Sequence, residues 1–145
     1  MKKAFLLLAL LSAGFLGTFA APDYSGSWTG YITQHSPSAL ATNYYFNLVL
    51  EVNGDEISGH SEIRMWDEHE VYGIMDVEGT FDDYTLELNE TEITRQQIYN
   101  YAVWCLKNMK LQYVLENGVE SLRGRWFGAE CSGPGDVYLE RTPAG

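Results

Sequence analysis

The feature that most constrains the fold is a strict alternation of apolar and polar residues in short segments separated by turn signals. A two-residue period is typical of β-strands that bury one face. In the segment 44–52, for example, every second residue is apolar, from Tyr44 to Val52. Two such segments run into Asn53-Gly54-Asp55 and Asn117-Gly118, which predict tight hairpin turns. The alternation therefore predicts an all-β protein.

About eight or nine alternating segments follow one another with short links, from residues 26–34 to residues 137–141. A meander of this size forms either a sandwich or a barrel, and closing the sheet removes its exposed edges. We therefore expect a closed antiparallel up-and-down barrel of about 8–9 strands. Residues 21–145 contain no internal repeat, low-complexity run or linker, so we expect a single domain there.

One stretch, residues 95–104, departs from the alternation. Thr94 and Gln97 are spaced as a helix capping box, and Tyr101 and Cys105 follow with helical spacing. A short helix near 95–104 is one interpretation. A polar strand or loop is the other, and the sequence leaves both open.

The N-terminus has the organisation of a signal peptide. Lys2 and Lys3 precede the apolar run 4–11, and residues 18–20 offer the small side chains that a signal peptidase reads. A bilayer span needs about 20 unbroken apolar residues, and Ser12 already interrupts this run. We therefore expect residues 1–20 to be removed, leaving a secreted or periplasmic chain, 21–145, without a membrane span.

Charge and cysteine content fit an exported protein. Two of the nine Lys and Arg residues, and none of the twenty Asp and Glu residues, lie in residues 1–20, so removing them changes the net charge from −11 to −13. Such a surface repels nucleic acid and anionic lipid headgroups. The only two cysteines, Cys105 and Cys131, predict a disulfide, because paired cysteines are the rule in exported chains.

The first and last expected strands carry a resemblance to a known group of barrels. Gly26-Ser27-Trp28 is a G-x-W motif, and Arg141 lies on the apolar side of the final strand. This combination resembles the calycins, a group of β-barrels that includes the lipocalins, avidin-like proteins, fatty-acid-binding proteins and a family of small bacterial metalloprotease inhibitors. The resemblance implies that Trp28 packs across the closed end of the barrel beneath Arg141, since a guanidinium stacks well on an indole.

Two binding functions follow as expectations. The first is capture of a small apolar or aromatic ligand at the open end, because inward glycines and a serine leave the interior underfilled unless large side chains occupy the space. The second, by analogy with calycin protease inhibitors, is a protein-interaction barrel with a filled core. The candidate ligand contacts are Tyr44, Phe46, Met65, Trp66, Met75 and Tyr101.

No motif indicates an enzyme. The sequence has no G-x-S-x-G, no H-E-x-x-H and no phosphate-binding glycine loop, so we rank catalysis below both binding functions and infer no catalytic residue. Asp67-Glu68-His69-Glu70 is the densest polar group and is either a charged surface turn or, less favoured, a site for a hard cation. We infer no metal and no cofactor.

Overall fold

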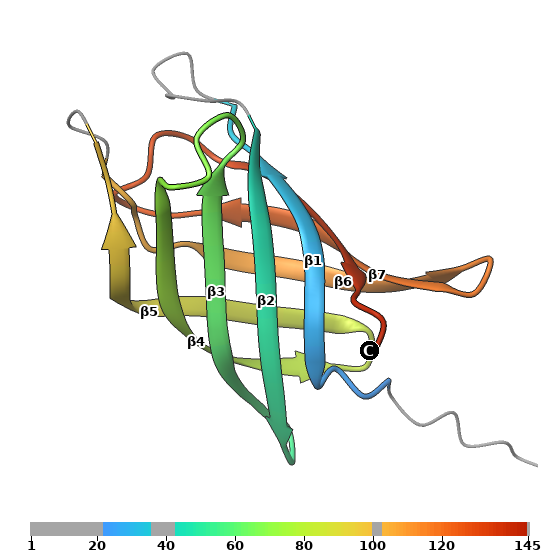
Figure 1. Cartoon of the computed structure of the whole chain (residues 1–145). Coiled ribbons are helices and arrows are strands. Elements are labelled where there is room, and N and C mark those ends of the chain that lie inside the picture. Colours follow the sequence, from blue (N-terminus) through green and yellow to red (C-terminus); the bar gives the residue numbers. More distant parts are fainter. Residues whose placement is uncertain (1–21, 36–42, 100–102, 145) are drawn as a thin grey trace, which may run out of the picture.

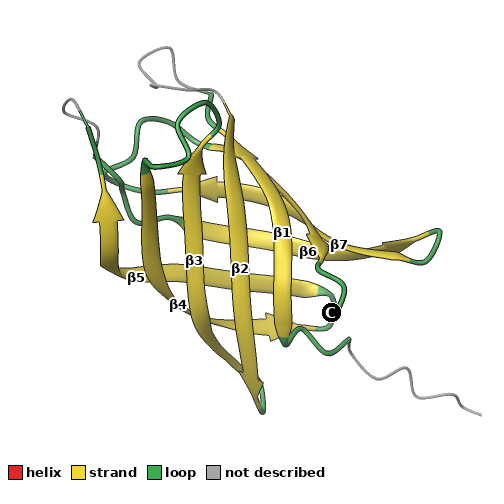
Figure 2. Ribbon diagram, in the orientation of Figure 1, coloured by secondary structure: helices red, strands yellow, loops and turns green. Residues whose placement is uncertain are grey.

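The computed structural model describes residues 22–35, 43–99 and 103–144, which form one closed antiparallel barrel (Figures 1 and 2). Each strand pairs with the next along the chain, and the last pairs with the first. The strands are β1 (Gly26–Thr33), β2 (Asn43–Asn53), β3 (Glu56–Met65), β4 (Tyr72–Asp82), β5 (Thr85–Gln97), β6 (Asn108–Glu116), β7 (Val119–Phe127) and β8 (Gly135–Arg141). The prediction of an all-β, closed up-and-down barrel is confirmed, with eight strands.

The expected signal peptide, residues 1–20, lies outside the described residues. Within the described ranges, no helix is long and apolar enough to cross a membrane.

Two hairpin turns form where the sequence predicted them. Gly54 separates β2 from β3 with a φ of 65°. Asn117 and Gly118 join β6 to β7 with φ values of 52° and 77°. Turns with a positive φ match the right-handed twist of the flanking strands, and Asn and Gly adopt this conformation at little cost.

The helical interpretation of residues 95–104 is wrong where the structure describes them. Arg95 and Gln97 belong to β5 and pair with Ile74 and Tyr72 on β4. The Thr94 hydroxyl donates a hydrogen bond to the Ile74 carbonyl instead of capping a helix. Cross-strand pairing therefore outweighs the local helical spacing. Residues 98, 99, 103 and 104 are irregular, and residues 100–102 lie outside the described part.

Strand β5 contains two irregularities that change which side chains face inward. The pairing with β4 shifts register between Ile74 and Met75 and again between Asp76 and Val77. An extra residue in one strand re-aims the side chains beyond it. As a result, the inward face of β5 passes from Leu88 and Glu90 to Ile93.

The interior of the barrel is packed with apolar side chains. Seven of the strands contribute side chains with 0% exposure, namely Trp28, Phe46, Leu48, Met75, Leu86, Leu88, Leu111, Leu122 and Leu139. These side chains are therefore covered on all sides by neighbouring protein atoms.

The inward glycines Gly79 and Gly124 allow close approach of neighbouring strands and do not enlarge the interior. A Cβ atom at Gly124 would lie 1.9 Å from the Lys110 carbonyl oxygen, and one at Gly79 would lie 2.1 Å from the Glu87 carbonyl oxygen. Both positions therefore exclude any larger residue unless the strands separate. These glycines mark tight bends of the sheet.

Candidate functional site

One end of the barrel is sealed by Trp28 and Arg141. They are cross-strand partners on β1 and β8, and the Arg141 guanidinium carbon lies 4.2 Å from the Trp28 ring centroid. The Trp28 indole N–H donates to the Tyr24 carbonyl at 3.0 Å. Tyr24 is itself fully buried and donates its hydroxyl to the Asp83 carbonyl at 2.6 Å. The segment before β1 thus closes this end as a plug.

Glu120 holds the outer side of Arg141. Its carboxylate accepts from Arg141 Nε at 2.6 Å and from the Tyr113 hydroxyl at 2.8 Å. The hydrogen bond from Arg141 is the main cause of a lowered pKa of Glu120, and the hydrogen bond from Tyr113 lowers the pKa further. Burial of the carboxylate acts in the opposite direction. Burial and the bond to Glu120 raise the pKa of Tyr113, so its hydroxyl stays a donor.

The lowered pKa of Glu120 predicts an acid-dependent contribution to stability. The unfolded carboxyl, with its ordinary pKa of 4.5, binds a proton more readily than the folded one. The contribution is therefore complete above this value and is lost as the pH falls through the lower folded pKa. We expect Glu120→Gln to lower the free energy of unfolding by about 1 kcal/mol at pH 7, a modest value because the pair is partly solvated. Urea unfolding should show this deficit shrinking below pH 4.5; a deficit that is constant with pH would contradict the assignment.

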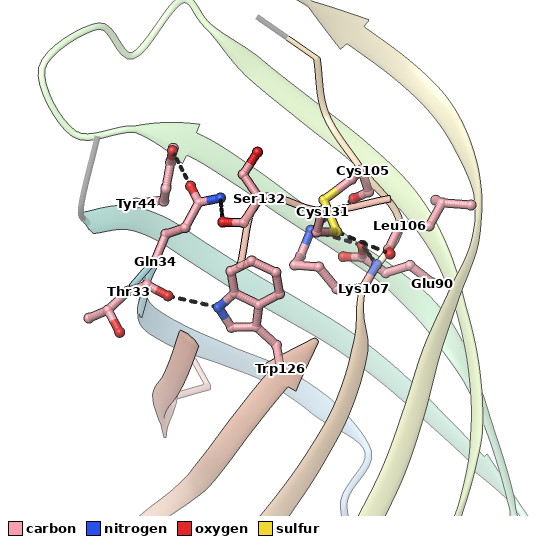
Figure 3. The surroundings of a disulfide bond; sticks show 10 residues. All are labelled: Thr33, Gln34, Tyr44, Glu90, Cys105, Leu106, Lys107, Trp126, Cys131 and Ser132. Carbon is pink, nitrogen blue, oxygen red and sulfur yellow. Dashed lines mark hydrogen bonds and ion pairs between the residues drawn. A yellow bond between two sulfur atoms is a disulfide. The ribbon is translucent and has the colours of Figure 1, made fainter. Parts of the chain in front are cut away.

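The opposite end of the barrel is tied together by a disulfide and a network of hydrogen bonds (Figure 3). Cys105 and Cys131 form the predicted bond and join the β5–β6 and β7–β8 connections. The Gln34 amide links the Tyr44 hydroxyl to the Ser132 carbonyl, at 2.9 and 2.7 Å. Segments that are distant in sequence are thereby held together over this end.

Removing the disulfide is expected to destabilise the barrel substantially. The bond spans a sequence separation of 26 residues. Closing a loop of this size contributes about 3 kcal/mol in the chain-entropy account. Cys105→Ser/Cys131→Ser should therefore unfold at a lower urea concentration than wild type. Reduction should shift the wild type by a similar amount and leave the double variant unaffected, and equal midpoints without reductant would contradict this prediction.

The structure separates the six candidate ligand contacts. Phe46 and Met75 are core residues with 0% exposure, and Tyr44 is 6% exposed. Met65 is half-buried and packs on the core at the end of β3. Trp66 lies on the outer wall, where its ring stacks on Tyr45 at 4.2 Å. Tyr101 lies outside the described residues. The other five candidates are divided between the core and the outer wall, so they do not line one common cavity.

A buried ion pair inside the barrel was not predicted. Lys107 Nζ lies 2.8 Å from Glu90 Oε2, and the two side chains are 3% and 0% exposed. The Ser61 hydroxyl donates to Glu90 Oε1 at 2.6 Å, and the Lys107 backbone N–H donates to Oε2 at 2.9 Å. Glu90 shares the inward face of β5 with Leu86 and Leu88, and this parity was the available signal. Lys107 lies outside the alternating segments, so the sequence pattern gave no indication that its side chain is buried.

Described residues line hollows on the outer wall and at the sealed end. One of about 520 Å³ lies over β3–β5 and includes Glu56, Glu78 and Asn89. Another of about 440 Å³ lies beside Tyr84 and Arg141. Across the described ranges, no three His, Cys, Asp or Glu side chains are placed to share a metal ion, and this includes Asp67–Glu70.

Fold and site together define a closed eight-stranded barrel with a densely packed interior, sealed at one end by an Arg–Trp stack and tied at the other by a disulfide. No family model matches the chain, and no curated protein is significantly similar to it in sequence.

Proposed function

We propose that this protein is a secreted, calycin-like barrel that binds another protein through its outer surface. Small-molecule capture inside the barrel is the less favoured function. The G-x-W motif with its stacked Arg141 supports the calycin kinship. The disulfide supports an oxidising compartment, because such bonds persist mainly in exported proteins.

The observation that carries this proposal is the packing of the interior. Small-ligand sites are preformed clefts or cavities of about 300–1,000 Å³. Here the interior side chains Phe46 and Met75, expected from the sequence to contact a ligand, have no exposed surface at all. The polar interior groups Glu90 and Lys107 satisfy each other. A ligand inside the barrel would have to displace this packing, whereas a partner on the outer wall would not.

Two measurements on the mature chain, residues 21–145, test the proposal. Native mass spectrometry of freshly purified protein should give the bare mass, and a panel of lipophiles should leave the thermal midpoint unchanged. The immobilised chain should retain a stoichiometric partner from the exported proteins of its source cells. A co-purifying apolar molecule at 1:1 ratio, or the absence of any retained partner, would overturn the proposal.

A further inference from the structure

A continuous row of aromatic and arginine side chains crosses the outer wall of six strands. Its members occupy consecutive cross-strand positions, so each is the direct neighbour of the next. All point outward, because the residues before and after each of them along its strand point inward. We call this row the outer belt; from β7 through β8 and β1 to β4 it consists of Arg123, Tyr138, Tyr31, Tyr45, Arg64 and Tyr72.

The side chains of the outer belt are held in place by one another. Tyr31 and Tyr138 stack with ring centroids 5.6 Å apart, and at either end a guanidinium covers a ring. Tyr45 stacks on Trp66 at 4.2 Å with an interplanar angle of 10°. Trp66 remains 43% exposed and Tyr31 41% exposed. Ordered aromatic side chains lose little conformational entropy on binding, which favours them as contact residues.

The composition and orientation of the outer belt fit a protein partner. Tyr, Trp and Arg are the residues most enriched among the energetic hot spots of protein interfaces. Because the rings stack face to face, much of their flat surface is already covered. A sugar would need free ring faces, whereas side chains of a protein also pack against ring edges and hydroxyl groups.

Charge complementarity identifies the kind of partner. The β3–β4 loop beside Trp66 exposes the carboxylates of Asp67, Glu68 and Glu70, and none of the ion pairs between described residues involves them. The two belt arginines add little positive charge, because each of them pairs with a glutamate on its own hairpin or strand. The whole chain carries a net charge of −11. Such a field attracts cationic proteins and repels anionic ones.

We infer that the outer belt, with the carboxylates of residues 67–70 at its margin, is the docking surface for a cationic protein. This inference rests on the proposed function and adds the location of the surface and the chemistry of the partner. Apolar side chains of the partner would pack on the belt rings, and its lysines and arginines would face the carboxylates.

The test uses the mature chain immobilised at its C-terminus and the exported proteins of the source cells as the probe. The belt variant is Tyr45→Ser/Trp66→Ser, and its control is Leu115→Ser/Val119→Ser, which removes exposed apolar surface from the β6–β7 hairpin. The retained partner should be basic, and its Kd should rise about 100-fold for the belt variant, as expected for hot-spot residues. The control should bind as wild type does.

A second pair of variants tests the charge argument. Neutralising the loop acids should weaken binding about 10-fold at low salt, mainly through slower association, and the difference should vanish at high salt. A charge-matched control at the far β2–β3 turn should have a smaller effect. The variants are Asp67→Asn/Glu68→Gln/Glu70→Gln and, as control, Glu51→Gln/Asp55→Asn/Glu56→Gln.

The possible results distinguish failure of this inference from failure of the proposed function. A retained partner that binds the belt variant as tightly as wild type, or that is acidic, overturns this inference and leaves the proposed function standing. If no partner is retained, both fail. Thermal unfolding of every variant establishes that it is folded. Should the belt variant unfold, Tyr31→Ser/Tyr138→Ser, at the other half of the belt, replaces it with the same expectation.

Discussion

Glu90→Gln and Lys107→Met are each expected to lower the free energy of unfolding by about 3–5 kcal/mol. Each substitution leaves the other partner's charge inside the barrel without its counter-ion, and both side chains are almost completely buried. The loss should appear in urea unfolding at neutral pH as a lower midpoint with an unchanged slope. A comparable change in an exposed ion pair, such as Lys110 with Glu87, should cost less than about 1 kcal/mol.

The double variant Glu90→Gln/Lys107→Met distinguishes a net stabilising pair from one that is costly only when broken. Replacing a buried ion pair by neutral groups of similar shape is often close to neutral. The glutamine amide oxygen at position 90 would still accept the hydrogen bond from the backbone N–H of residue 107, which Glu90 now accepts. We therefore expect the double variant to recover most of the stability, with a coupling of about 2 kcal/mol or more between the two sites. Additive losses would show that the two charges do not interact in the folded state.

Trp28→Ala is expected to cost about 3–5 kcal/mol, the usual range for removing a large aromatic side chain from a core. Trp28 has 0% exposure, and its ring supports the Arg141 guanidinium and meets Tyr113 edge-on at 6.5 Å. Its removal therefore creates a cavity and takes away the surface on which a partly buried cation rests. Thermal and urea unfolding measure the loss.

Trp66→Ala is the matched control for Trp28→Ala. Trp66 is 43% exposed on the outer wall, so the same change should cost about 1 kcal/mol or less. Equally small losses at the two positions would mean that the stack at the sealed end contributes nothing beyond an ordinary surface contact. A loss at Trp28 below about 1 kcal/mol would have the same meaning.

Much of the architecture follows from local patterns. Alternation shows which side chains of a strand share a face, and turn residues such as Asn117-Gly118 set where neighbouring strands reverse. These two signals are enough to predict an all-β barrel with an approximate strand count. The pairing of Trp28 with Arg141 was implied by the resemblance to the calycins, and the position of the Arg on an apolar face agreed with it.

The residues that were missed depend on distant contacts. The extra residues of β5 are specified by its pairing with β4, so the inward position of Ile93, which lies beyond the first register shift, could not be assigned from a simple period. The buried carboxylate of Glu90 is stabilised by Lys107, which lies 17 residues further along the chain. Trp66 directly follows a strand, where parity no longer says which way a side chain points, and its stacking on Tyr45 places it outside.

The pairing of β1 with β8 has a consequence for how the chain reaches its native state. Every nascent chain lacking residues 135–141 has unsatisfied hydrogen-bonding groups on two strand edges, β1 and β7. The barrel therefore cannot close before residues 135–141 have been synthesised, and contacts of such long sequence separation are expected to make folding slow. The intermediates remain open to binding by chaperones for as long as the C-terminal strand is missing.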